Sequence, residues 1–111
     1  MNIRIGGADE HRELRRQGGK WLRQLRKNVG LSQKQLASQL DIEFDTLIAQ
    51  LESGIGRVPT HRYGDWANVM QIPIETFVRE LLRYYDPVAF EFLVSRAGSL
   101  PDSPLDSKTN S

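Results

Sequence analysis

Apolar residues recur every three or four positions through most of the chain, which is the spacing of one face of an α-helix. No segment alternates apolar and polar residues for long enough to predict a strand. The pattern therefore predicts an all-α protein: a compact five-helix domain followed by an additional C-terminal helix. We expect helices at about residues 19–28, 32–40 and 44–53, from Thr60 through Met70, from about Pro73 through Leu82, and from Asp86 to about Arg96.

Helix start and stop signals mark the first half of this domain. Ser32-Gln33-Lys34-Gln35 has the order of a capping box, in which the Ser32 hydroxyl and the Gln35 side chain satisfy each other's backbone amides. Gly30 and Gly54 are placed to end the helices that precede them. Ala37 is small enough to allow two helices to cross closely, so 32–53 predicts two short helices joined by a tight turn.

The two ends of the chain differ from its middle. Residues 1–17 are polar and contain Gly6-Gly7, which predicts a flexible N-terminal arm, with a helix from Asp9 as the alternative. Residues 98–111 are rich in Ser, Asp and Pro, which predicts a disordered tail. The folded part then divides into a domain at 18–82 and a C-terminal helix at 83–97.

Charge is distributed unevenly although the net charge is only +1. Residues 1–40 carry 9 Lys and Arg against 3 Asp and Glu (+6), and residues 41–111 carry 6 against 11 (−5). A basic N-terminal half favours contact with phosphate, and chance clustering of surface charge is the alternative. The chain has no cysteine, no signal-peptide pattern and no apolar run long enough to span a membrane, so we expect a cytoplasmic, nucleoid-associated protein without membrane contact.

The sequence lacks the patterns of an enzyme. Its two histidines, His11 and His61, are 50 residues apart without metal-ligand spacing, and there is no phosphate loop or nucleophile elbow. We therefore expect no catalytic residues, metal or cofactor.

Three short motifs together resemble the xenobiotic-response-element family of helix-turn-helix regulators, the Cro and phage-repressor type. They are Gly30-Leu31-Ser32-Gln33, Leu36-Ala37 and Leu51-Glu52-Ser53-Gly54, and the resemblance covers residues 18–82. It implies a lambda-repressor-like domain that binds double-stranded DNA, usually as a dimer. It also implies that Gln33 lies beside a phosphate, and that Arg26 and Glu52 form a structural ion pair.

The resemblance makes 44–53 the recognition helix. If Ile48 and Leu51 face the core, the base-facing positions are Asp45, Thr46, Leu47, Ala49 and Gln50. Asp45 has a helix N-cap as its alternative role. The turn before this helix is one residue longer than is common in the family, Asp41, Glu43 and Asp45 make its tip acidic, and the helix has no Lys or Arg. Phosphate contacts are therefore expected elsewhere, at Gln33, Lys34, Lys20, Arg23, Arg57 and Arg62.

Large apolar side chains are concentrated near the C-terminus. Tyr84, Tyr85, Phe90, Phe92 and Leu93 exceed what a five-helix core needs, which predicts a homodimer interface. The alternative is that this last helix folds back on its own domain.

The most concrete function is a dimeric transcriptional repressor, with contact to polymerase or another regulator as a second partner. The competing function is a protein-interaction module on the same scaffold, such as an antitoxin or adaptor, which exposed Phe44 and Leu47 would favour.

Overall fold

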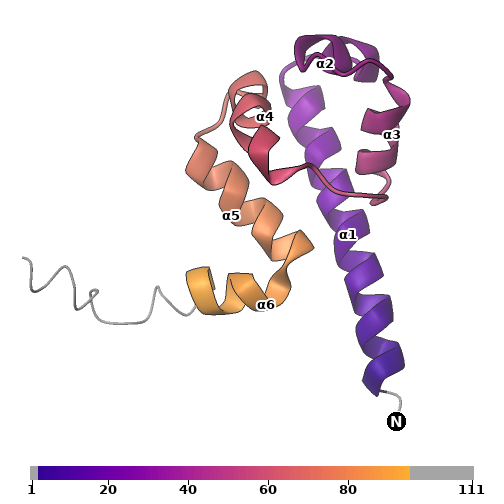
Figure 1. The fold of residues 1–111 in the computed structure, drawn as a ribbon, viewed down its shortest axis with the longest axis vertical. Coiled ribbons are helices and arrows are strands. Elements are labelled where there is room, and N and C mark those ends of the chain that lie inside the picture. Colours follow the sequence, from indigo (N-terminus) through magenta and orange to yellow (C-terminus); the bar gives the residue numbers. More distant parts are fainter. Residues whose placement is uncertain (1–2, 96–111) are drawn as a thin grey trace, which may run out of the picture.

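The computed structural model describes residues 3–95, and every element within that range is helical (Figure 1). The all-α prediction is therefore confirmed for these residues. The elements are α1 (Ile3–Asn28), α2 (Gln33–Gln39), α3 (Thr46–Glu52), a 3₁₀ turn η1 (Thr60–Arg62), α4 (Tyr63–Met70), α5 (Ile74–Tyr85), α6 (Pro87–Phe90) and a π-helical turn η2 (Glu91–Ser95).

The first helix is much longer than the sequence pattern predicted. A single helix runs from Ile3 to Asn28, so the predicted flexible arm at 1–17 is wrong for the residues described, and the helix does not begin near Gly19. Ion pairs one turn apart, Arg12 with Asp9 and Arg16 with Glu13 (each 2.8 Å), support the segment that was expected to be an arm. The N-terminal half of α1 projects beyond the other helices (Figure 1).

Close packing between α1 and α3 depends on two glycines. A Cβ atom added to Gly19 would lie 2.4 Å from the backbone oxygen of Glu52, the last residue of α3. Gly54, two residues after the end of α3, has φ +87° and would place a Cβ 2.9 Å from the backbone of Arg16. These contacts leave no room for a side chain, so α3 is seated directly on the backbone of α1.

One buried cluster joins α1 to α5. Phe77 of α5 lies at its centre, with the rings of Trp21, Tyr63 and Trp66 at 5.6, 5.8 and 6.4 Å between centroids. The largest fully buried side chains are Trp66, Phe77, Leu22, Leu36, Leu40, Ile48, Leu81 and Val58. Residues of α1 to α5 together with Val58 therefore form one core, and Ala37 is buried within it.

The later helix boundaries differ from expectation in three places. One is the end of α5, which runs to Tyr85, so the predicted boundary between a domain at 18–82 and a C-terminal helix at 83–97 falls inside this helix. Thr60 does not cap α4, because a 3₁₀ turn begins at Thr60 and α4 begins only at Tyr63. The last expected helix is a single α-turn at α6 that continues as the π-turn η2, although Pro87 occupies the first turn as predicted. Arg96 and the tail at 98–111 lie outside the described residues.

Candidate nucleic-acid interface

The connection between α2 and α3 sets the orientation of both helices. The Ser32 hydroxyl accepts the amide of Gln35 at 3.0 Å, and the Gln35 side chain accepts the amide of Ser32 at 2.8 Å, so the predicted capping box is present. The longer turn is accommodated by Asp41, which adopts φ +60°. Asp45 occupies the N-cap position of α3, but its side chain makes no capping hydrogen bond.

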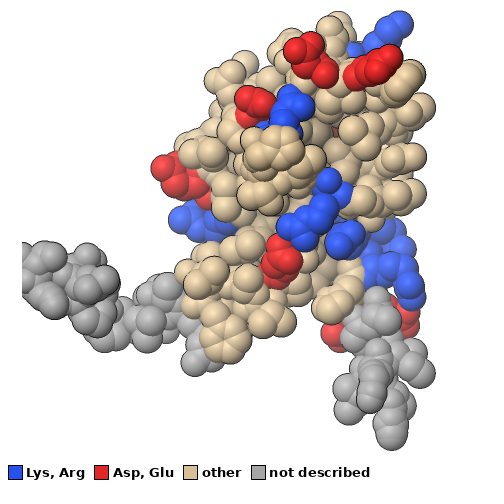
Figure 2. Space-filling model, viewed as in Figure 1, with Lys and Arg blue, Asp and Glu red and all other residues tan. Residues whose placement is uncertain are grey.

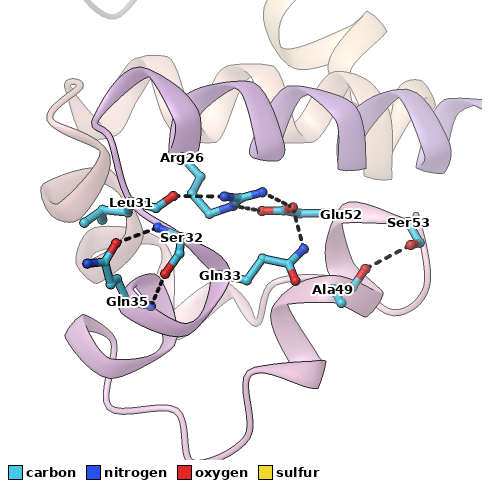
Figure 3. Close-up of polar contacts among 8 residues, drawn as sticks. All are labelled: Arg26, Leu31, Ser32, Gln33, Gln35, Ala49, Glu52 and Ser53. Atoms are coloured by element: carbon cyan, nitrogen blue, oxygen red, sulfur yellow. Dashed lines mark hydrogen bonds and ion pairs between the residues drawn. The ribbon is translucent and has the colours of Figure 1, made fainter.

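A buried polar network joins α1, α2 and α3 (Figure 3). The guanidinium of Arg26 donates to both carboxylate oxygens of Glu52 at 2.7 and 3.0 Å, and to the carbonyl of Leu31 at 2.9 Å. Gln33 donates to the same carboxylate at 3.0 Å. The hydrogen bond with Glu52 raises the pKa of Arg26. Because these bonds satisfy both buried charges, the network fixes α2 and α3 relative to α1.

The outer face of α3 is left free by the fold. Thr46, Leu47 and Gln50 are exposed, whereas Ile48 and Leu51 are buried. Asp45 is also exposed, and Ala49 is half-buried. The five predicted base-facing residues therefore lie on or beside one accessible surface. This surface is not basic, because α3 has no Lys or Arg and the turn before it carries Asp41, Glu43 and Asp45. Figure 2 shows red side chains at the top of the molecule, next to blue ones.

The six predicted phosphate contacts separate into two groups. Lys20, Arg23 and Lys34 are exposed, and no ion pair or hydrogen bond involves their side chains within the part of the chain that the structure describes. The side-chain amide of Gln33 donates a hydrogen bond to Glu52. The remaining two, Arg57 and Arg62, pair with carboxylates of the same chain.

Arg57 and Arg62 make internal contacts. Arg57 pairs with Asp86 at 2.8 Å and lies 4.7 Å from the centroid of the Tyr85 ring, and its pKa is raised, chiefly by the hydrogen bond to Asp86. Arg62 pairs with Asp65 at 2.8 Å and donates to the carbonyl of Leu40. Both arginines hold the segment after α3 onto the domain, so the structure does not present them as free phosphate ligands.

The predicted dimer residues also divide. Tyr85 is buried, and its hydroxyl accepts the amide of Val58 at 3.2 Å, so it belongs to the core and the interface assignment is wrong for it. Tyr84 packs against Trp21 with centroids 6.2 Å apart, and Phe90 lies under the guanidinium of Arg83 at 4.5 Å. Phe92 and Leu93 are the exposed members, at 57% and 68%.

Sequence reasoning missed a second apolar stripe on α5. Ile74, Val78 and Leu82 are spaced by four residues and line a shallow groove of about 380 Å³ with Val94. The core stripe on the same helix is Phe77, Leu81 and Tyr85. The apolar periodicity of Phe77–Leu82 indicates one buried face of the helix. The series at 74, 78 and 82, with residues four apart, is the sequence signal for the second apolar stripe.

Replacing Tyr85 by phenylalanine should lower the free energy of unfolding by about 1–3 kcal/mol, because the buried amide of Val58 loses its acceptor. Burial raises the pKa of Tyr85. The folded state therefore retains a proton that the unfolded state releases near pH 10, so this residue's contribution to stability falls as pH rises through that region. Urea denaturation of the wild-type protein and of Tyr85→Phe at several alkaline pH values measures this contribution. An identical loss of unfolding free energy with rising pH in the two proteins would contradict it.

Comparison with known proteins finds no matching family model, no matching curated protein and no matching solved structure. None of the described helices is both long and apolar enough to cross a membrane. Within the described residues, no three His, Asp or Glu side chains come together as metal ligands.

Proposed function

We propose that this chain is a helix-turn-helix protein that binds double-stranded DNA and regulates transcription as a dimeric repressor, in the cytoplasm and on the nucleoid. One observation carries the proposal: α3 has an exposed outer face that the fold does not use, on a helix fixed by the buried Arg26–Glu52–Gln33 network. A helix that reads DNA must be held at a fixed angle so that its side chains reach base edges in the major groove.

Thr46, Leu47 and Gln50 have the chemistry for base recognition. The Gln50 amide can donate to and accept from an adenine, the Thr46 hydroxyl suits several bases, and Leu47 can contact a thymine methyl group. Because α3 has no cation, affinity must come from exposed cations beside it, and Lys20, Arg23 and Lys34 fill this role. The second amide N–H of Gln33 also remains for a phosphate after its bond to Glu52.

Selection of bound duplexes from a random pool, followed by fluorescence anisotropy, tests the proposal. Gln50→Ala should weaken binding to the selected duplex by about 5–100-fold, because one bidentate base contact contributes about 1–3 kcal/mol of discrimination. Lys34→Glu should weaken binding to every duplex and make the salt dependence shallower. Asn68→Ala removes an exposed amide on α4 and is the control. Equal affinity of Gln50→Ala and the unmodified protein for the selected duplex would contradict base reading by α3.

We place the dimer contact on the second apolar stripe of α5 with the adjoining η2 turn. Ile74, which lines the groove with Val78, Leu82 and Val94, is 45% exposed, and Leu93, the sequence neighbour of Val94, is 68% exposed. Glu75 and Arg79 line the same groove, and neither has an ion-pair partner among the described residues. In an antiparallel two-fold pairing, Glu75 of one protomer meets Arg79 of the other, so the surface complements itself.

Ile74→Glu should convert the dimer to a monomer, because it places an unpaired charge within an apolar contact. Sedimentation velocity across a concentration series measures this. Ile55→Glu is the control, since Ile55 is 60% exposed but lies outside this surface. A wild-type chain that sediments as a monomer at all concentrations, or equal behaviour of the two variants, would contradict the placement.

The exposed apolar tip before α3 favours a second candidate function, a protein-interaction module. Phe44 is 66% exposed and Leu47 is 40% exposed, beside the exposed carboxylates of Asp41, Glu43 and Asp45. Such a surface suits a partner with a basic and apolar face. Phe44→Ser should abolish binding to this partner, whereas Lys34→Glu should leave it intact. The two variants therefore separate this function from DNA binding.

A further inference from the structure

A groove lies between the projecting half of α1 and the corner where α5 meets α6. Its volume is about 700 Å³, within the range of small-molecule sites. One wall is α1, through His11, Arg12 and Arg15. The opposite wall is largely apolar and consists of Tyr84, Tyr85, Asp86, Pro87, Val88, Ala89 and Phe92. It shares no lining residue with the α5 groove assigned to the dimer.

Arg15 differs from the other arginines at this groove. Arg12 pairs with Asp9, and the neighbouring Arg57 pairs with Asp86, each at 2.8 Å. Arg15 is half-buried as a whole residue. Its guanidinium lies over the Tyr85 ring, 5.6 Å from the ring centroid, and makes one long, solvent-exposed hydrogen bond, 3.4 Å, to the carbonyl of Gly56. No carboxylate pairs with it among the described residues. A cation without a carboxylate partner beside an apolar wall favours an anion, which would form charge-assisted hydrogen bonds with its remaining N–H groups.

Asp86, the carboxylate on the apolar wall, repels such an anion only weakly. Asp86 is already paired with Arg57, whose guanidinium also lies over the Tyr85 ring. Two guanidinium groups therefore lie over the ring of Tyr85, which lines the groove, and the one nearby carboxylate that lines the groove, Asp86, is paired with Arg57. Figure 2 shows blue side chains gathered over the segment after α3 and the lower half of α1. Charge therefore favours a negatively charged occupant, and the opposite wall favours an apolar one.

We propose that this groove binds an organic anion with an aromatic or aliphatic body and a single carboxylate or sulfonate group. The anionic group pairs with Arg15, and the apolar body covers Tyr84, Pro87 and Val88. Gly54, two residues after the end of α3, packs on the backbone of Arg16 and also lines the groove. The occupant therefore lies against the segment that follows α3. The proposal does not require that the chain bind DNA.

Two fluorescent probes test the charge requirement on the full chain. 8-Anilino-1-naphthalenesulfonate is an anion, and N-phenyl-1-naphthylamine has the same ring system without the charge. We expect one sulfonate probe per chain, bound at least about 10-fold more tightly than the neutral probe, since a hydrogen bond to a charged group contributes about that factor. Arg15→Gln should remove this preference and leave the neutral probe's affinity unchanged. Lys27→Gln, at an exposed cation of α1 outside the groove, should change neither.

A second variant keeps the test independent of the packing of Arg15. Val88 is 67% exposed, so Val88→Asp places a carboxylate in the groove without disturbing the core, and should weaken the sulfonate probe more than the neutral one. Equal affinities for the two probes, or an equal loss of both in Arg15→Gln, would overturn the proposal. It would also be overturned if a second copy of the chain fills the groove, in which case probe binding weakens as protein concentration rises and Val88→Asp abolishes the dimer.

Discussion

Replacing Arg26 by methionine is expected to lower the free energy of unfolding by about 3–5 kcal/mol, because it leaves a buried carboxylate without its ion-pair partner. Glu52 is 8% exposed and accepts hydrogen bonds from Arg26 and Gln33. Without Arg26, only the amide of Gln33 remains to satisfy it. This loss is a large fraction of the roughly 5–15 kcal/mol that stabilises a typical domain. Urea denaturation followed by circular dichroism measures it.

The double variant Arg26→Met, Glu52→Leu is the matched control. It removes both charges and fills the same space with apolar groups, so it should recover most of the stability that the single variant loses. Strong non-additivity of this kind is expected for two residues in one network. If Arg26→Met lowers the free energy of unfolding by less than about 1 kcal/mol, the ion pair is not the main interaction that holds α3 on α1.

Replacing Gly19 by alanine is expected to destabilise the protein by about 2 kcal/mol net. The new Cβ would lie 2.4 Å from the backbone oxygen of Glu52, so α1 and α3 must separate, and overpacking of this kind costs up to about 3 kcal/mol. The higher helix propensity of alanine offsets about 1 kcal/mol of that cost. Thermal and urea denaturation of the variant provide the measurement.

Gly64→Ala is the control for helix propensity alone. Gly64 lies within α4, and its added Cβ would make only an ordinary contact, 3.6 Å, with the Ile74 side chain. This variant should gain about 0.5–1 kcal/mol. If Gly19→Ala is as stable as Gly64→Ala, then α3 does not lie as close to α1 as the structure places it.

Features determined by neighbouring residues were predictable from the sequence. The capping box at Ser32 and Gln35 involves residues three apart, so its pattern is visible without the fold. The alternation of buried and exposed positions along α3 followed from helical periodicity. The N-terminus of α1 shows the limit of such reasoning, since Gly6-Gly7 and a polar composition predicted a break where the helix is continuous.

Contacts between distant residues were not predictable from local pattern. Arg57 pairs with Asp86, 29 residues away, and the Tyr85 hydroxyl binds the amide of Val58, 27 residues away. The sequence predicted Arg57 as a phosphate contact, through the family resemblance and its position after the recognition helix, and Tyr85 as an interface residue from local composition. The Arg26–Glu52 pair spans 26 residues and was anticipated only through the family resemblance, which supplied the long-range information that spacing lacks.

The most direct test of the central claim is to map the DNA contact on the protein by amide chemical-shift changes. Labelled protein is titrated with a duplex selected from a random pool, at about 50 and 200 mM salt. The largest chemical-shift changes should fall on α3 and on the first turn of α2, and should include the side-chain amide of Gln50. They should persist at the higher salt. Changes confined to α5, or changes spread over the basic surface that disappear at the higher salt, would contradict sequence reading by α3.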